Sequence, residues 1–124
     1  MSVLTCYILF SFALQPKLVL STLENYVGTL TLNHSERRNA LSHAVVEELI
    51  GGLKVLEDQK ARAVILRAQP GVKVWCAGHD VNELPVSGRD PLSHADTLRR
   101  LVRSIEEFPA PVIALIEVLG CTIP

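Results

Sequence analysis

Two short segments of the sequence carry residue types that could bind and activate an anionic ligand. The segment VWCAGHDVNEL, at 74–84, places the small residues Ala77 and Gly78 immediately before His79 and Asp80. Small residues allow another molecule to approach the main chain closely. If a helical turn begins at Asp80, the N–H groups of Gly78 and His79 stay open beside it, and such groups stabilise negative charge. A tight strand-to-helix turn that binds no ligand explains these residues equally well.

The second segment, SERRNALS at 35–42, places two cations, Arg37 and Arg38, beside the small residue Ala40. Guanidinium groups are suited to anionic ligands, phosphates above all. On charge alone, however, a solvated surface loop is the better explanation of this segment.

Other kinds of catalytic site are poorly supported. None of the four histidines has the H-x-x-x-H spacing of a metal site, so we expect no metal ion. Cys76 has no assignable histidine partner, and a buried thiol beside Trp75 explains it better than a nucleophile does. The sequence contains no G-x-S-x-G, no P-loop and no G-x-G-x-x-G.

Length and composition indicate one small domain or part of a larger one. With 124 residues, 48% of them hydrophobic and 20% charged, the chain is expected to form a packed core. A net charge of −1 without a basic stripe argues against nucleic acid as a partner. The three cysteines are an odd number with no C-x-x-C pair, which favours a reducing compartment, and we expect a cytoplasmic protein.

The first 16 residues form an apolar leader whose status stays open. The run VLTCYILFSFAL, at 3–14, is uncharged but too short for a membrane span, which needs about 20 residues. Its length resembles that of a signal h-region, but Met1 and Ser2 place no cation before it. An extra strand or a non-native leader is the favoured interpretation, and we expect no membrane partner.

The elements that must position the two segments begin with a hairpin. Strands are predicted at 17–23 and 26–33, around a turn at Glu24 and Asn25. A helix is predicted after Ser42, which has the type of an N-cap. Adjacent glycines at 51 and 52 should cost this helix about 1 kcal/mol each, so close packing is expected to require them. Its apolar face comprises Val45, Val46, Leu49, Ile50, Leu53 and Leu56.

Two further strands and a helix complete the predicted order. The runs RAVILRA, at 62–68, and PVIALIEV, at 111–118, are typical of strands covered on both faces. The helix between them is predicted to begin at Ser93, with Asp96 supporting the cap, and to end before Pro109. Its apolar face comprises Leu98, Leu101, Val102, Ile105 and Phe108. This order predicts an α/β fold with a parallel sheet, in which sites lie beyond the carboxyl ends of the strands.

At this point the residues show a resemblance to a known family. The segments TLTLNHSERRNALS and RAVILRAQPGVKVWCAGHDVNELPVSGRDPLSHADTLRRLVRSIEEFPAPVIALIE resemble the first half of the crotonase superfamily of acyl-CoA enzymes. The resemblance implies a partial crotonase (ClpP-like) spiral fold of ββα units that is truncated before its second half. Residues 17–117 would form the N-terminal part of this domain, and residues 118–124 a divergent tail.

The resemblance also implies roles for individual residues. In the family, a cation in the first loop, here Arg37, approaches the phosphates of coenzyme A. The main chain at Ala40 and Ala77 frames the adenine and pantetheine, and the peptide N–H of His79 is one of two donors to the thioester oxygen. Gly78 leaves room for the thioester. The positions implied for coenzyme A binding are Arg37, Ala40, Ala77, Gly78, His79, Asp80 and Val81.

The chemistry implied is that of an acyl-CoA lyase. Loss of CO₂ from a malonyl-type thioester leaves an enolate whose charge lies on the thioester oxygen, where each peptide donor contributes about 2.7–4 kcal/mol. The stretch AGHDVNELPVSGRDPLS favours this decarboxylation, and hydration or isomerisation by an added carboxylate is the alternative. Coenzyme A is part of the substrate, so no separate cofactor is expected. Full-length relatives are homo-oligomers, either trimers or hexamers.

The sequence departs from the family after Glu117. There the family continues into a glycine-rich turn that supplies the second N–H, whereas this chain reads VLGCTIP, and Gly120 fits that turn only with an arbitrary gap. We therefore expect the chain alone to be nearly inactive. A truncated fragment that binds coenzyme A without catalysis is the alternative.

Overall fold

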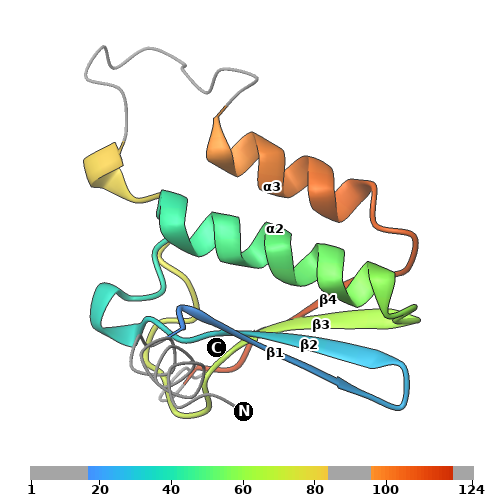
Figure 1. Ribbon diagram of the computed structural model, residues 1–124. Helices are drawn as coiled ribbons and strands as arrows, with labels where there is room; N and C mark the ends of the chain where they lie inside the picture. Colours follow the sequence, from blue (N-terminus) through green and yellow to red (C-terminus); the bar gives the residue numbers. More distant parts are fainter. Residues whose placement is uncertain (1–16, 84–95, 119–124) are drawn as a thin grey trace, which may run out of the picture.

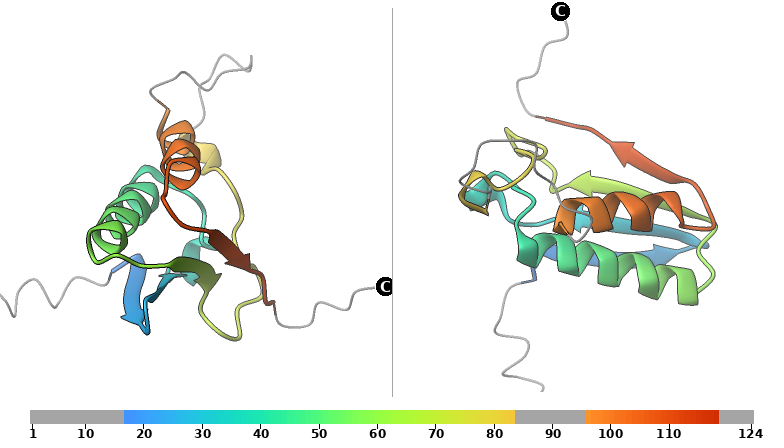
Figure 2. Two further views of the ribbon diagram at one scale, coloured as in Figure 1. Left: turned by 90° about the vertical axis from the view of Figure 1, so that its right-hand side faces the viewer. Right: turned by 90° about the horizontal axis from the view of Figure 1, so that it is seen from above.

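The fold is a four-stranded sheet with two helices on one face (Figures 1 and 2). The structure, a computed structural model, describes residues 17–83 and 96–118. The leader at 1–16, the predicted cap Ser93 and the tail from 119 onward lie outside the described residues. The elements are β1 (Val19–Glu24), β2 (Val27–Leu32), η1 (Ser35–Arg37), α2 (His43–Asp58), β3 (Ala63–Ala68), η2 (Val81–Glu83), α3 (Thr97–Glu106) and β4 (Val112–Leu115).

The strands lie in the order β1-β2-β3-β4, with β1 antiparallel to β2 and the other two pairs parallel. The predicted α/β class and parallel sheet are therefore confirmed. Helix α2 connects β2 to β3, and α3 connects β3 to β4, so each parallel pair is joined by a helical crossover. Parallel strands need such long connections, and the helices then cover the sheet.

The hairpin turn lies one residue later than expected. Asn25 and Tyr26 both have positive φ, 51° and 65°, which is the geometry of a two-residue hairpin turn whose twist matches that of the strands. Strand β2 consequently begins at Val27 rather than Tyr26. Asn25 stays in the turn, at a left-handed position that asparagine tolerates well, and the turn exchanges Glu24 for Tyr26.

Helix α2 packs closely on β2. The Oγ of its predicted N-cap, Ser42, accepts a hydrogen bond from the N–H of Val45 at 3.3 Å. A Cβ on Gly52 would lie 2.7 Å from a methyl group of Leu30, so close packing does require this glycine. A Cβ on Gly51 would have nothing within 4 Å, so the same expectation is wrong there. The core consists of Val19, Leu30, Leu32, Val45, Val46, Leu49, Leu53, Leu56, Ala61, Val64, Ala68, Leu101 and Phe108.

Helix α3 begins later than predicted. Its first residue is Thr97, and Asp96 is the N-cap, with φ −60° and ψ 139° and a carboxylate oxygen that accepts from Leu98 N–H at 2.8 Å. An extended residue at 96 interrupts any helix that runs on from Ser93, so that predicted start is wrong. Aspartate is as good an N-cap as serine. Val102, expected on the apolar face, is 48% exposed.

The outer face of the sheet is less covered than the apolar runs suggested. Both helices lie on the same face (Figure 2), so side chains that point away from them stay accessible. Ile113 in β4 is 53% exposed, and Ile65, its neighbour in β3, is partly buried. The expectation of cover on both faces is therefore wrong for β4, whereas no residue of β3 is exposed.

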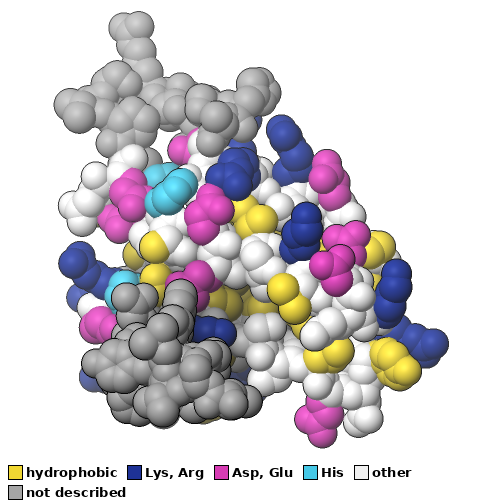
Figure 3. All heavy atoms as spheres, viewed as in Figure 1, with side chains coloured by type: hydrophobic (Ala, Val, Ile, Leu, Met, Phe, Trp, Pro, Cys, Tyr) yellow, Lys and Arg dark blue, Asp and Glu magenta, His cyan; other side chains and the backbone are white. Residues whose placement is uncertain are grey.

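Charged side chains of both signs mingle over the face formed by α2 and α3 (Figure 3). None of the helices in the described ranges is long and apolar enough to cross a membrane.

Candidate functional site

The loops that follow β2 and β3 are joined by hydrogen bonds into one unit. The side-chain amide of Asn39 donates to the carbonyl oxygen of Trp75 at 3.1 Å. Main-chain bonds join the N–H of Ala77 to the oxygen of Arg38 at 3.0 Å, and the N–H of Leu41 to the oxygen of Gly78 at 2.7 Å. The two segments predicted from their residue types are thus adjacent in space.

The second loop is also tied to the third strand end. The indole N–H of Trp75 donates to the carbonyl oxygen of Leu115, the last residue of β4, at 2.8 Å. Beyond β4, Glu117 pairs with Arg67 of β3 at 3.1 Å. The carboxyl ends of the three parallel strands therefore meet at one edge of the sheet, where α/β folds place their sites.

The first loop owes its shape to Asn39, which the sequence reasoning did not select. Arg38 and Asn39 both have left-handed backbone, with φ of 54° and 52°. Asn39 is only 1% exposed, and its Oδ1 accepts from the N–H of His34 at 2.8 Å. Asparagine is enriched at left-handed positions, and that tendency is the signal in RRNAL that could have revealed it.

The second loop turns at Gly78, whose φ is +86°. A Cβ there would have nothing within 4 Å, so the backbone conformation, and not lack of space, demands glycine. Its N–H donates to the Sγ of Cys76 at 3.3 Å, and the expectation of an open N–H is wrong for Gly78. Burial raises the pKa of the Cys76 thiol, and the N–H of Gly78 opposes this rise. The protonated, half-buried thiol is a poor nucleophile.

The peptide N–H of His79 differs from that of Gly78 in its hydrogen bonding. Among the residues that the structure describes, it donates no hydrogen bond. A parallel bridge pairs His79 with Leu41 and fixes the course of the strand-like segment. Asp80 then starts the expected turn, since its carboxylate accepts from Asn82 N–H at 3.0 Å and its carbonyl from Glu83 N–H at 3.0 Å.

A hollow of about 210 Å³ lies between the two loops. It is flanked by a second hollow of about 360 Å³, which shares four of its residues and extends toward the start of α2. There Glu83 accepts a hydrogen bond from the N–H of His43 at 2.9 Å, which ties the end of the loop to α2. The first hollow is lined by Arg37, Arg38, Ala40, Ala77, His79, Asp80, Val81 and Asn82.

Six of the seven positions selected from the sequence line this one hollow, all except Gly78. The lining includes two exposed cations, Arg37 and Arg38, and also His79, whose peptide N–H has no partner among the described residues. An arrangement of this kind suits a ligand that carries phosphate charge at one end and develops negative charge at the other.

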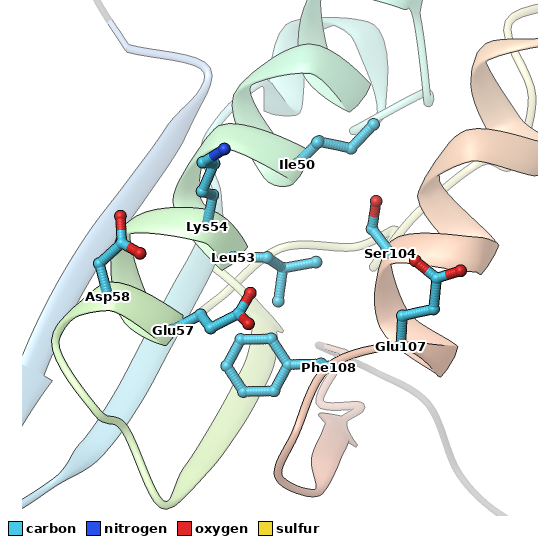
Figure 4. A pocket seen from close by; sticks show the side chains of 8 residues that line it. All are labelled: Ile50, Leu53, Lys54, Glu57, Asp58, Ser104, Glu107 and Phe108. Atoms are coloured by element: carbon cyan, nitrogen blue, oxygen red, sulfur yellow. The ribbon is translucent and has the colours of Figure 1, made fainter.

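Two other hollows contain none of the seven positions selected from the sequence. The cleft between α2 and α3, about 340 Å³, has Leu53 and Phe108 on its floor and Lys54, Glu57 and Glu107 around it (Figure 4). It contains none of the selected positions. A broader hollow of about 710 Å³ lies on the far side of Arg38, next to Lys73. In the described ranges, no three metal-ligating side chains cluster together.

Comparison with known proteins places the chain among acyl-CoA enzymes. Residues 22–121 match the family described as enoyl-CoA hydratase/isomerase. Methylmalonyl-CoA decarboxylase of Escherichia coli (strain K12) is 44% identical over 93 residues, which cover 75% of this chain and 36% of that protein. Human enoyl-CoA hydratase domain-containing protein 2, which is mitochondrial, is 38% identical over 99 residues, 73% of this chain and 32% of that protein.

Solved structures agree with this assignment. Methylmalonyl-CoA decarboxylase complexed with 2S-carboxypropyl CoA matches with a TM-score of 0.77 and 40% identity, over 85% of this chain and 40% of that one. The same enzyme in complex with 2-nitronate-propionyl-CoA gives a TM-score of 0.77 and covers 84% and 40%. The chain spans well under half the length of these relatives. From the family match, the sequence identity and the shared fold, the chain belongs to the enoyl-CoA hydratase/isomerase family, the crotonase group of acyl-CoA enzymes.

Proposed function

We propose that the hollow between the two loops binds a coenzyme A thioester, and that the chain is part of an acyl-CoA lyase resembling methylmalonyl-CoA decarboxylase. One observation carries the proposal. Residues from two loops that lie far apart in the sequence form the lining of a single hollow. They combine cations with a peptide N–H that has no partner among the described residues. A coenzyme A thioester requires positive charge near its phosphates and a hydrogen-bond donor near its thioester oxygen.

The relatives indicate the substrate class. Two of the matching decarboxylase structures hold a carboxypropyl CoA and a nitronate-propionyl CoA, each a coenzyme A compound with an acidic group on a three-carbon unit. A thioester with a carboxylate on its α-carbon is the corresponding substrate for decarboxylation. Coenzyme A belongs to this substrate, and its thioester carbonyl accepts the electron pair that the reaction releases.

The reaction follows from that electron flow. The bond between the α-carbon and the carboxylate carbon breaks, CO₂ leaves, and the electron pair forms an enolate with its charge on the thioester oxygen. The N–H of His79 would donate to this oxygen, and each such donor contributes about 2.7–4 kcal/mol to transition-state stabilisation. A proton from solvent then restores the α-carbon of the product thioester.

Hydration or isomerisation is the second candidate, favoured by the family match and by the human relative. Those reactions need a carboxylate that is free to exchange a proton. Of the described residues that line the two hollows, Asp80 and Glu83 are the carboxylates, and both already accept main-chain hydrogen bonds. Decarboxylation requires no such base.

Ligand titration tests the proposal. We expect propionyl-CoA to bind the purified chain measurably at low salt and more weakly at high salt, because charges beyond about 10 Å are screened at 0.1 M salt. Replacement of Arg37 by alanine should weaken binding at low salt and reduce the salt dependence.

The matched control is Arg99→Ala, which removes an exposed cation from α3 and should leave the affinity unchanged. Salt-independent binding that tolerates Arg37→Ala would show that the ligand lies elsewhere. Binding of free coenzyme A that equals that of propionyl-CoA would support the alternative of a coenzyme A-binding fragment without a thioester site.

A further inference from the structure

The loop segment that lines the hollow is tied to the start of α2 at two points. At its beginning, the N–H of Leu41 donates to the carbonyl oxygen of Gly78 at 2.7 Å. At its end, the Oε2 of Glu83 in η2 accepts a hydrogen bond from the N–H of His43 at 2.9 Å. Figure 1 shows η2 beside the first turn of α2. Residues 80–82, which line the hollow, lie between the two ties.

The second tie consists of one carboxylate contact. The other hydrogen bonds of residues 80–83 are local, since Asp80 accepts from the N–H groups of Asn82 and Glu83 and from the ring of the residue before it. Of the hydrogen bonds in the described ranges, only the one between Glu83 and His43 joins this turn to another element. Glu83 is therefore the polar contact that holds an internally bonded turn against α2.

The first turn of α2 is suited to receive a carboxylate. The first N–H groups of a helix have no partner within the helix and carry partial positive charge. Ser42 caps one of them, that of Val45, and the first turn of α2 contains no acidic side chain of its own. Glu83 supplies negative charge there from a different segment of the chain. The contact thus combines a charge-assisted hydrogen bond with the helix dipole.

Resting on the proposed function, we infer that Glu83 is a positioning residue, whose carboxylate holds residues 80–82 in place as one wall of the hollow. Val81 is 74% exposed, so its side chain contributes little packing that would fix this wall. Arg37 and Ala40 complete the lining from the first loop. A turn released from α2 would change the separation of the two sides of the hollow, and with it the fit of a bound thioester.

A simpler role for Glu83 leads to a different expectation. Glu83 and Arg37 line the same second hollow, so the carboxylate lies near the cation that we expect to attract the phosphates. If Glu83 acts only through its charge, every neutral residue at position 83 should strengthen the binding of an anionic ligand to the same extent. If Glu83 holds the turn, a neutral residue that accepts a hydrogen bond should bind the ligand better than one that does not.

The variants Glu83→Gln and Glu83→Ala separate these roles because both are neutral. The glutamine carbonyl can still accept from the N–H of His43, whereas alanine cannot. We expect propionyl-CoA to bind Glu83→Ala about two- to tenfold more weakly than Glu83→Gln, the range that one neutral hydrogen bond contributes. The matched control pair is Glu106→Gln and Glu106→Ala, at an exposed glutamate of α3, for which the two affinities should be equal. The full 124-residue chain is used throughout.

Hydrogen exchange of the ligand-free chain tests the tie independently of the ligand. Amide exchange over residues 80–82, measured by mass spectrometry, should be faster in Glu83→Ala than in Glu83→Gln. The urea midpoint should be similar in the two variants, because His43 is exposed and water can replace the lost acceptor.

The outcomes separate this inference from the proposed function. Equal exchange in the two variants would overturn the positioning role and leave the thioester site standing. Faster exchange in Glu83→Ala with equal affinities would also overturn it, since the tie would then not serve the ligand. A Glu83→Ala chain that does not fold would overturn it too, because the tie would then serve the whole fold. A wild-type chain that does not bind propionyl-CoA would overturn the proposed function itself, and this inference with it.

Discussion

The buried side chain of Asn39 reaches across from the loop after β2 and donates to the carbonyl oxygen of Trp75, 3.1 Å away in the loop after β3. It is the one polar side chain among the fully buried residues of the described core. Its Oδ1 simultaneously accepts from His34 N–H. A single amide group therefore bridges both walls of the proposed site, in addition to the main-chain bonds that join the two loops.

We predict that Asn39→Ala destabilises the chain strongly. The carbonyl of Trp75 and the N–H of His34 would lose their partners, and each buried unsatisfied group costs about 1–3 kcal/mol. Asn25→Ala is a matched control, since Asn25 also has left-handed backbone but is exposed in the hairpin turn. Urea unfolding should show a much larger loss for position 39. Equal losses of stability at the two positions would mean that the left-handed backbone alone causes the loss, and that the hydrogen bonds of Asn39 do not contribute.

Gly78→Ala is expected to impair binding as well as stability. Its φ of +86° makes a left-handed alanine necessary, which costs about 1–2 kcal/mol. Gly71→Ala imposes the same strain, at φ +85°, in a loop outside the proposed site. We expect similar shifts in the thermal midpoint for the two variants, but weaker binding of propionyl-CoA only for Gly78→Ala. Comparable binding by both would show that the thioester does not approach residue 78.

Turnover by the chain alone is predicted to be slow. Within the described residues, His79 supplies one candidate donor, and loss of one oxyanion donor typically costs about 10²–10³ in rate. Incubation of the purified chain with methylmalonyl-CoA, followed by chromatographic detection of propionyl-CoA, measures this. Rates typical of ordinary enzymes would contradict the need for a second donor.

The sequence predicted most elements because their signals are local. Alternating burial in β2 and the Ser42 cap of α2 both follow from nearest neighbours along the chain. The start of α3 was missed because Ser93 and Asp96 are competing caps, and local rules rank them equally.

The clustering of the selected positions was predictable from the sequence, but the hydrogen bonds within the candidate site were not. Small and charged residues beyond strand ends identified both loops. The Asn39 bridge and the bond from Gly78 N–H to Cys76 arise only when the chain is folded. Similarly, PVIALIEV is as apolar as a covered strand, and only the one-sided helix layer reveals that Ile113 is exposed.

That exposure leads to the last prediction, that the isolated chain self-associates. Ile113 and Ile116 are 53% and 66% exposed at or just after β4, and in the described part of the chain β4 pairs with β3 alone. An exposed apolar edge strand presents both unpaired backbone groups and hydrophobic surface to another chain. The opposing possibility is a compact monomer in which other residues of the chain protect this edge.

Size-exclusion chromatography with light scattering over a range of concentrations distinguishes the two. We expect species larger than a monomer, and we expect Ile113→Lys to shift them toward the monomer because a charge on an edge strand disfavours pairing. Val102→Lys is the matched control, since Val102 is similarly exposed, at 48%, but lies on α3, and this change should leave the assembly unaltered. A sharp monomer peak for the wild type with a cooperative thermal transition would refute the prediction. Such a result would mean that the edge of β4 is already protected within one chain.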